Sequence, residues 1–347
     1  MSIAYIRHVL NSNGAWKPSN AGFSASFRSA AAFPTSEIIG DSCPLPTLTA
    51  MDSSPQPIGS GSFGSVYMIL SSLVAFKEVQ LESNAAQLHA EFEALEQIYK
   101  TCQSSDALFS LPRPLAYKDA QKFRALAYRS PRTGHPRPLV ASASFAAFER
   151  PTYAMDRIQA LSTEVAARIR SQFYPSGVPA KGPLLFRLYF GKDFTDNRPS
   201  RFINTSHFFL DVARYRQLAS SEGGTAGDLP STEIVAEAMG NMLGRIHICG
   251  GYDARDIEFV LGGNGFSGFA FYVIDFNQMR KWKSVNELVD AHIANDPYFP
   301  VARRGEQVYE AFRSGYRAAY ATRLDIADEF LSQLEALQDT DGRQAPP

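Results

Sequence analysis

Three glycines, Gly59, Gly61 and Gly64, follow the spacing G-x-G-x-x-G. Glycine tolerates unusual backbone dihedrals and lets N–H groups approach the oxygens of a phosphate. A dinucleotide-binding site would require a helix directly after this loop, but an apolar, β-prone segment follows it here. The context therefore favours a phosphate-cradling loop between two strands, although a glycine- and serine-rich turn without a ligand has the same composition. The expected loop contacts are Gly59, Gly61, Ser62, Phe63, Gly64 and Val66.

A lysine follows the loop on the next predicted strand. Lys77 closes the apolar run Val74-Ala75-Phe76, a context that separates it from the solvent-facing lysines usual in strands. In a nucleotide site this lysine would reach the α- and β-phosphates, and the small side chain of Ala75 would leave room for an adenine ring. Glu91, on the helix predicted next, is placed to pair with Lys77 and hold it. Met155, near the end of a later strand, completes the predicted ATP site.

A second group of acidic residues, Asp253, Glu258 and Asp275, lies far along the chain. Asp253 and Glu258 have the spacing of the kinase catalytic loop H-R-D-x-x-x-x-N, with glutamate in place of asparagine and Gly251-Tyr252 in place of His-Arg. Asp275 begins Asp-Phe-Asn, which resembles the metal-binding D-F-G element. Asn277 replaces the glycine, and asparagine tolerates the positive φ expected in this turn. Isolated aspartates often only cap loops, so these residues gain weight from their order along the chain.

The glycine loop, the lysine, the helical glutamate and the two acidic loops occur in the order found in protein kinases. This order predicts an α+β, protein-kinase-like fold of two lobes, with a small β-rich N-lobe and a shortened helical C-lobe. The predicted cofactors are ATP and Mg²⁺, with Asp253 as the catalytic residue and with Asp275 and Glu258 as metal ligands. Glu258 adds negative charge beside the phosphates, which weakens the prediction of catalysis.

Hydrophobic periodicity places these residues on secondary structure. Residues 65–79 have the pattern of two strands, and residues 82–100 carry apolar side chains at helical spacing. Another helix begins after Pro230-Ser231-Thr232 and ends at Gly250-Gly251. Residues 257–274 have the pattern of a hairpin with a glycine-rich turn.

The same patterns divide the chain into segments. The first 53 residues are rich in serine, alanine, glycine and proline without a sustained period, which predicts a disordered leader; the lack of acidic residues at its start is also typical of organelle transit peptides. The expected organisation is a leader over 1–53, a nucleotide-binding N-lobe over 54–158, a helical C-lobe over 159–338 and a flexible tail over 339–347.

The second acidic segment carries a closer resemblance to a known family. Residues 243–262, together with Ile274-Asp275-Phe276-Asn277 and residues 295–300, resemble a fungal family of kinase-like proteins catalogued as domain of unknown function 3669. The resemblance extends from Leu111 to Tyr320 and implies a kinase-like fold. Some members are labelled zinc-finger proteins, but three scattered cysteines do not support such a site in this chain.

The bulk composition excludes several classes of function. A net charge of −1 argues against a broad nucleic-acid or membrane surface, and no run of the sequence approaches the length of an apolar membrane span. Three isolated cysteines form no disulfide framework and suit a reducing, intracellular compartment, either cytoplasm or nucleus. The expected partners are a nucleotide and a small-molecule or protein acceptor, with no nucleic acid and no membrane.

Three functions stay open at this point. No A-P-E element follows Asp275, so the first is an Mg-ATP-dependent phosphotransferase with a small hydroxyl-bearing acceptor, similar to the aminoglycoside phosphotransferases. The second is a catalytically inactive pseudokinase that serves as an interaction or nucleotide-sensing module. The third keeps the fold and transfers a nucleotidyl group instead, because fold alone does not determine chemistry.

Overall fold

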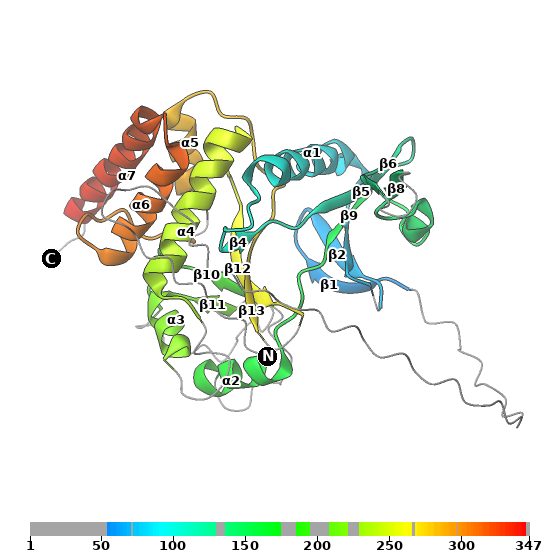
Figure 1. The fold of residues 1–347 in the computed structure, drawn as a ribbon, viewed down its shortest axis with the longest axis horizontal. Coiled ribbons are helices and arrows are strands. Elements are labelled where there is room, and N and C mark those ends of the chain that lie inside the picture. The colour runs from blue at the N-terminus through cyan, green and yellow to red at the C-terminus, as the bar shows by residue number, and fades with distance from the viewer. Residues whose placement is uncertain are drawn as a thin grey trace, which may run out of the picture. The chain divides into compact units, whose positions relative to one another are not determined.

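An antiparallel sheet forms the N-terminal part of the structure (Figure 1). The structure is a computed structural model that describes residues 54–344 except 71, 130–135, 175–184, 195–207, 221–228, 266–267 and 296. Six strands follow the order β1-β2-β3-β9-β5-β6 across the sheet. In that order, their bounds are Gln56–Ser60, Gly64–Met68, Val74–Val79, Thr152–Asp156, Pro114–Lys118 and Phe123–Ala125.

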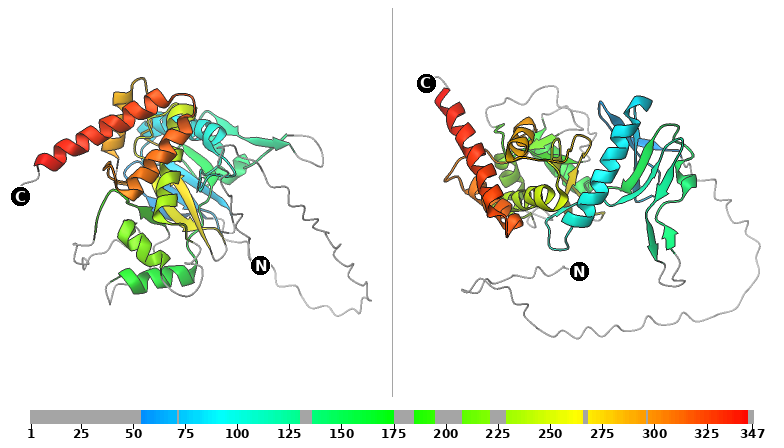
Figure 2. Two further views of the ribbon diagram at one scale, coloured as in Figure 1. Left: turned by 60° about the vertical axis from the view of Figure 1, so that its left-hand side comes forward. Right: turned by 90° about the horizontal axis from the view of Figure 1, so that it is seen from above.

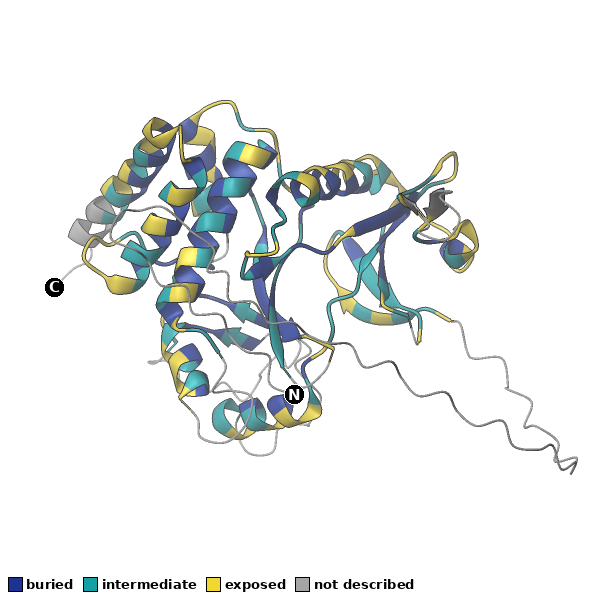
Figure 3. Cartoon of the chain, viewed as in Figure 1, coloured by how far each residue is buried: buried dark blue, intermediate teal, exposed yellow. Residues whose placement is uncertain are grey.

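Helix α1, Ala85–Cys102, packs against this sheet through β5 and β9. The views in Figures 1 and 2 agree in placing it alongside the strands. Its predicted apolar face is buried, and the opposite face is exposed, as Figure 3 shows. The buried residues Leu88, Phe92 and Leu95 recur at helical spacing, which confirms the periodicity found in the sequence. Two glutamates are buried with them, and one of these, Glu91, contacts Lys77 on the sheet.

A second sheet of five strands lies in the C-terminal part, in the order β11-β10-β12-β13-β4. In that order, the bounds are Phe208–Leu210, Phe186–Leu188, Glu258–Gly263, Phe269–Ile274 and Phe109–Ser110. The predicted hairpin is confirmed as the antiparallel pair β12–β13, in register from Glu258↔Ile274 to Gly263↔Phe269. The apolar run from residue 184 to residue 190 also indicates a strand in the sequence, and β10 lies within it. The sequence did not indicate β11 and β4, because they are only two or three residues long and give no alternation to detect.

Helices cover the remainder of the C-terminal part. Their bounds are α2 Thr163–Phe173, α3 Val212–Ala219, α4 Thr232–Arg245, α5 Val285–Ala294, α6 Gln307–Tyr320 and α7 Leu324–Gln344. The predicted helix after Ser231 is α4, and the Ser231 side chain caps it by accepting from the N–H of Ile234. It continues through one π-helical turn, Ile246–Gly250, and ends at Gly251 with a φ of 72°. Helix α4 packs against α6, and α7 packs against α5 and α6.

Smaller elements complete the fold. Strands β7, Ala127–Arg129, and β8, Pro136–Pro138, form a separate hairpin. Short 3₁₀ turns span Glu82–Asn84 before α1 and Ser142–Phe145 before β9. None of the helices in the described part of the chain is long and apolar enough to cross a membrane.

The order of elements matches the predicted α+β, kinase-like fold. A glycine turn joins β1 to β2, Lys77 lies on β3, and a helix carrying Glu91 follows, which is the arrangement of a kinase N-lobe. The predicted leader, 1–53, lies outside the described residues. At the other end, α7 continues to Gln344, past the boundary at 338, because a polar composition alone does not end a helix.

Candidate active site

A cleft with a volume of about 850 Å³ is lined by residues of both sheets. This volume is within the range of small-molecule sites. The predicted ATP and metal contacts that line it are Gly59, Gly61, Ser62, Phe63, Gly64, Val66, Ala75, Lys77, Glu91, Met155, Glu258 and Asp275. The structure thus brings together residues that lie far apart in the sequence. Asp253 is the predicted site residue that does not line this cleft.

Lys77 is the centre of a buried charge cluster in this cleft. Its Nζ donates to Oε1 of Glu91 at 2.7 Å and to Oδ1 of Asp275 at 3.0 Å. Burial lowers the pKa of Lys77, but the two carboxylates outweigh it and raise the pKa above its ordinary value. The lysine is therefore charged at neutral pH, and it joins β3, α1 and the loop after β13. Protein kinases position phosphates with this combination of lysine, helical glutamate and aspartate.

Tyr153 holds the glutamate of this cluster in place. Its hydroxyl donates to Oε1 of Glu91 at 3.0 Å, and burial together with Glu91 raises the pKa of Tyr153 well above its ordinary value. The tyrosine consequently stays protonated and remains a donor. Lys77 and Tyr153 are cross-strand neighbours in β3 and β9, which explains how both reach the same carboxylate. Sequence reasoning missed Tyr153, because it depends on this pairing of strands far apart in the chain.

The glycine loop has one glycine that packing requires and two that face open space. A Cβ at Gly64 would lie 2.8 Å from the carbonyl oxygen of Glu78, whereas at Gly61 nothing lies within 4 Å and at Gly59 only one atom does, at 3.9 Å. The loop is held by Gln80, whose Nε2 donates to the carbonyl oxygen of Gly61 at 2.5 Å. The open side at Gly59 and Gly61 leaves the room that close approach of a phosphate needs.

Apolar side chains of both sheets line the cleft beside its charged residues. Strands of the first sheet contribute Val66 and Ala75, with Met155 opposite Ala75 in the register of β3 and β9. The second sheet contributes Val260 and Ile274. An apolar slot with charged residues beside it suits a ligand that has a flat aromatic part and an anionic part. This is the location that the sequence analysis predicted for adenine.

Asp253 does not line the cleft. Its carboxylate is buried and binds backbone N–H groups of its own loop and of the segment after β13. Oδ1 accepts from the backbone N–H groups of Arg255 at 3.1 Å and Arg280 at 2.9 Å, and Asp253 is 6% exposed. The residue of this loop that lines the cleft is Asp256, whose Oδ2 accepts from Nε2 of Gln278 at 2.7 Å. Motif spacing alone did not distinguish the two aspartates.

Backbone strain is concentrated in the two acidic loops. Positive φ angles occur at Ala254 (56°), Asp256 (64°) and Asp275 (61°), where non-glycine residues rarely adopt them. The prediction of a positive φ at Asn277 was wrong, since the turn places it on Asp275 instead. Asn295 braces the first loop: its Oδ1 accepts from the N–H of Asp256 at 2.5 Å, and its Nδ2 donates to the carbonyl oxygen of Ala254 at 3.1 Å.

Glu258 lines the cleft as predicted, but its carboxylate pairs with an arginine from a different strand. Nε of Arg187 donates to Oε2 of Glu258 at 2.9 Å, and Nη2 of Arg187 lies 2.5 Å from Oε1. Burial raises the pKa of Glu258 to about 7; Arg187 opposes this rise, and Asp275 and Asp256 add to it. The position that is a metal-binding asparagine in kinases is therefore occupied here by one half of an ion pair.

The raised pKa of Glu258 predicts a specific pH dependence of stability in the nucleotide-free protein. The pKa rises from 4.5 to about 7 on folding, so between these values the folded state binds more protons than the unfolded state. The free energy of unfolding should therefore fall as the pH rises through this window and level off above it, relative to Glu258→Gln. Urea unfolding of both proteins at several pH values measures the difference. Parallel pH profiles would contradict it.

The acidic residues of the cleft suit a magnesium ion that arrives with phosphates rather than a preformed metal cage. In the described part of the chain, no group of three or more histidine, cysteine or acidic side chains is arranged to hold a metal ion. Mg²⁺ usually takes one or two protein carboxylates and completes its shell with phosphates and water. Asp275, with 34% of its side chain exposed, provides such a carboxylate.

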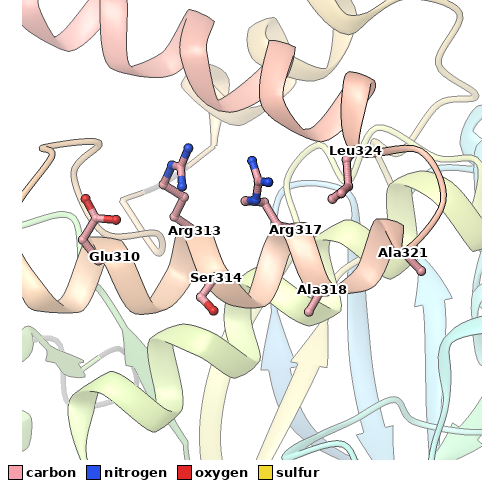
Figure 4. Close-up of a pocket in the computed structure, with 7 residues that line it drawn as sticks. All are labelled: Glu310, Arg313, Ser314, Arg317, Ala318, Ala321 and Leu324. Atoms are coloured by element: carbon pink, nitrogen blue, oxygen red, sulfur yellow. The ribbon is translucent and has the colours of Figure 1, made fainter. Parts of the chain in front are cut away.

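A second, shallower hollow lies over α6 and the start of α7 (Figure 4). Figure 4 shows Glu310, Arg313 and Arg317 on one side of α6. Both arginines already pair with α7, Arg313 with Glu335 at 3.2 Å and Arg317 with Asp328. The charges of this hollow serve helix packing, so the cleft at Lys77 is the better candidate for a functional site.

Comparisons with known proteins found a matching family model and similar solved structures. A family model designated domain of unknown function 3669, with the description zinc finger protein, matches residues 271–328, from β13 to the start of α7. This segment contains no cysteine and one histidine, so it lacks the cysteine and histidine ligands of a zinc finger. The family match agrees with the resemblance noted from the sequence over this segment.

Among solved structures, one described as WaaP in complex with acyl carrier protein is similar with a TM-score of 0.40 and 12% sequence identity. The match covers 85% of this chain and 89% of the other. No curated protein matches the sequence. The chemistry of the cleft therefore has to be derived from its own residues.

Proposed function

We propose that this chain binds Mg-ATP in the cleft and transfers the γ-phosphoryl group to a hydroxyl of a small acceptor. The observation that carries the proposal is the ion cluster that the buried Lys77 and Glu91 form with the partly exposed Asp275 in an apolar slot. Maintaining such a cluster costs desolvation free energy, so a purely structural role would be served as well by apolar packing. A role in holding phosphates accounts for it.

Each part of the cleft has a role in this proposal. The apolar slot beside Ala75 and Met155 holds the adenine, and the open space beside Gly59 and Gly61 receives the phosphates. Lys77 has three N–H donors. Glu91 and Asp275 each accept one, which leaves the third for an α- or β-phosphate oxygen. Magnesium, when bound with ATP, would be held by Asp275 and would neutralise charge on the phosphates.

Asp256 is the residue that we assign as general base. The acceptor hydroxyl gives its proton to the Asp256 carboxylate while its oxygen bonds to the γ-phosphorus. The bond from that phosphorus to the bridging oxygen breaks, and ADP leaves with the bonding electrons. The cleft location of Asp256 and its hydrogen bond from Gln278 orient the carboxylate for this step.

The segment after Asp275 supports a small acceptor. Only residues 276–284 separate Asp275 from helix α5, which begins at Val285. Protein kinases place an activation segment, ending in A-P-E, between these points to dock a peptide. This connection is too short to form an activation segment of that kind. A small hydroxyl compound therefore fits the site better than a protein substrate.

Thermal unfolding with and without Mg-ATP tests the nucleotide half of the proposal. We expect Mg-ATP to raise the melting temperature of the wild type, because a ligand that binds only the folded state stabilises it. Lys77→Met should lose this response, since it removes the cation that meets the phosphates. Lys100→Met is the matched control: Lys100 is exposed and lies outside the cleft, and its partner Glu96 keeps a second cation, Arg124, so this variant should keep the full response. A wild type that shows no response, just like Lys77→Met, would end the nucleotide hypothesis.

Turnover separates the remaining alternatives. The Arg187–Glu258 pair in place of a metal-binding asparagine favours a pseudokinase as the second candidate. That function predicts stabilisation by Mg-ATP with no ADP produced in the presence of any acceptor. Attachment of AMP to protein, without phosphate transfer, would instead select nucleotidyl transfer.

A further inference from the structure

We propose that Arg187 is a second phosphate-binding residue of the cleft, and that Glu258 holds its guanidinium against the terminal phosphates of the nucleotide. The inference rests on the proposed binding of ATP. It gives Glu258 a positioning role in place of the metal-ligand role predicted from motif spacing. A fixed guanidinium would then supply positive charge where a kinase asparagine holds a metal ion.

The strand that carries Arg187 directs it into the cleft. β10 lies between β11 and β12, with Arg187 opposite Val260 in the antiparallel pair. Side chains alternate along a strand, and the neighbours Phe186 and Leu188 are fully buried on the other face. Arg187 is therefore on the face that lines the cleft, with 25% of its side chain exposed.

The contact with Glu258 fixes the orientation of the Arg187 guanidinium but uses only some of its N–H donors. Both contacts use the edge formed by Nε and Nη2, at 2.9 Å and 2.5 Å from the carboxylate. A guanidinium carries five N–H donors in one plane, so a two-point contact sets that plane and occupies only two of them. The N–H groups of Nη1 lie outside this edge and suit the oxygens of a phosphate.

Charge balance gives a reason for a second cation. Among the described residues that line the cleft, the cations are Lys77 and Arg187, and the acids are Glu91, Asp156, Asp256, Glu258 and Asp275. Lys77 is already shared by two carboxylates. A triphosphate adds further negative charge, and an arginine that is fixed in advance binds it without the entropy cost of ordering a long side chain.

The register places Arg187 at the phosphate end of the cleft. Glu258 stands opposite Ile274 at the start of the β12–β13 hairpin, one residue before Asp275. Because Asp275 contacts Lys77, this end of the hairpin is where the phosphates are expected. Arg187 reaches the same end through Glu258, whereas Met155 and Ala75 mark the adenine end. The terminal phosphates are the part of ATP within its reach.

Binding of a nucleotide series to the full chain tests this inference. Dissociation constants for Mg-ATP, Mg-ADP and AMP are measured by titration calorimetry for the wild type and Arg187→Gln. We expect the loss of a charge-assisted contact to weaken ATP binding by about 10- to 100-fold. AMP, which lacks the terminal phosphates, should bind both proteins with nearly the same constant. Equal losses for ATP and AMP would overturn the role of Arg187.

Three further variants complete the test: Arg113→Gln, Glu258→Gln and the double variant that combines Arg187→Gln with Glu258→Gln. Arg113→Gln is the matched control, because Arg113 pairs with Asp156 beside the adenine end at 3.2 Å, and it should show no loss selective for ATP. Glu258→Gln should weaken ATP binding less than Arg187→Gln and add no loss in the double variant, as expected for a residue that acts through Arg187.

The double variant also removes both charges of the pair, so it serves if Arg187→Gln alone does not fold. An ATP affinity equal to the wild type in this double variant would contradict the inference. A wild type that binds none of the three nucleotides would instead refute the proposed function itself.

Discussion

Asp256→Asn is expected to reduce phosphoryl transfer by about 10²- to 10⁴-fold, the usual contribution of a general base. The substitution keeps the shape of the side chain and its hydrogen bond from Gln278, but asparagine cannot accept a proton. Binding of Mg-ATP and the melting temperature should change little by comparison. The measurements are kcat, KM for ATP and thermal unfolding on the same preparations.

Asp253 provides the matched comparison in the same loop. Asp253→Ala removes an oxygen that accepts from the N–H groups of Arg255 and Arg280, and it leaves two donors without partners. Each lost partner costs about 1–3 kcal/mol of folding free energy, so this variant should have a lower melting temperature. Asp253 and Asp256 are thus separated by different observables, stability for one and the chemical step for the other.

The opposite outcome would reassign the base. If Asp253→Asn abolished turnover at full stability and Asp256→Asn remained active, Asp253 would be the base, as motif spacing predicts. The pH profile gives an independent check, because kcat/KM of the wild type should fall at acidic pH as the base becomes protonated, and Asp256→Asn should lack this limb.

The part of the site that the sequence predicts well depends on local structure. The glycine turn, the strand with Lys77 and the helix with Glu91 follow one another along the chain, so strand and helix periodicity is enough to place them. Their pairing at 2.7 Å needs only that α1 packs its apolar face on the sheet. Asp275 joins them from far along the chain because the β12–β13 hairpin, itself a local pattern, delivers it.

The part that the sequence does not predict depends on long-range contacts without a motif. Which aspartate enters the cleft is decided by positive φ angles at Ala254 and Asp256 and by the brace from Asn295, 39 positions from Asp256 along the chain. Arg187 lies on a strand that the sequence indicates, but no motif marks it as a site residue, and its partner Glu258 is 71 positions away. Tertiary packing, rather than local propensity, selects these residues.

Gly315→Ala is expected to destabilise the fold strongly, although alanine is the better helix former. In an exposed helix interior, the exchange would gain about 1 kcal/mol. Here an added Cβ would overlap the carbonyl oxygen of Glu237, because α6 approaches the backbone of α4 at this point. Gly240 on α4 is in the reciprocal position, where a Cβ would overlap the carbonyl oxygen of Phe312. Both collisions involve backbone, so rotating a side chain relieves neither.

Separating the two helices to admit one methyl group would disrupt the packing of several buried residues along α4 and α6. We expect a loss of about 3 kcal/mol or more in the free energy of unfolding for either variant, at the upper end for overpacked cores. The melting temperature should fall by roughly 5–10 °C. Ser314→Ala is the control: Ser314 precedes Gly315 on α6 but is exposed, so its exchange should leave stability unchanged or slightly raised. Equal melting temperatures for Gly315→Ala and Ser314→Ala would show that the two helices do not cross this closely.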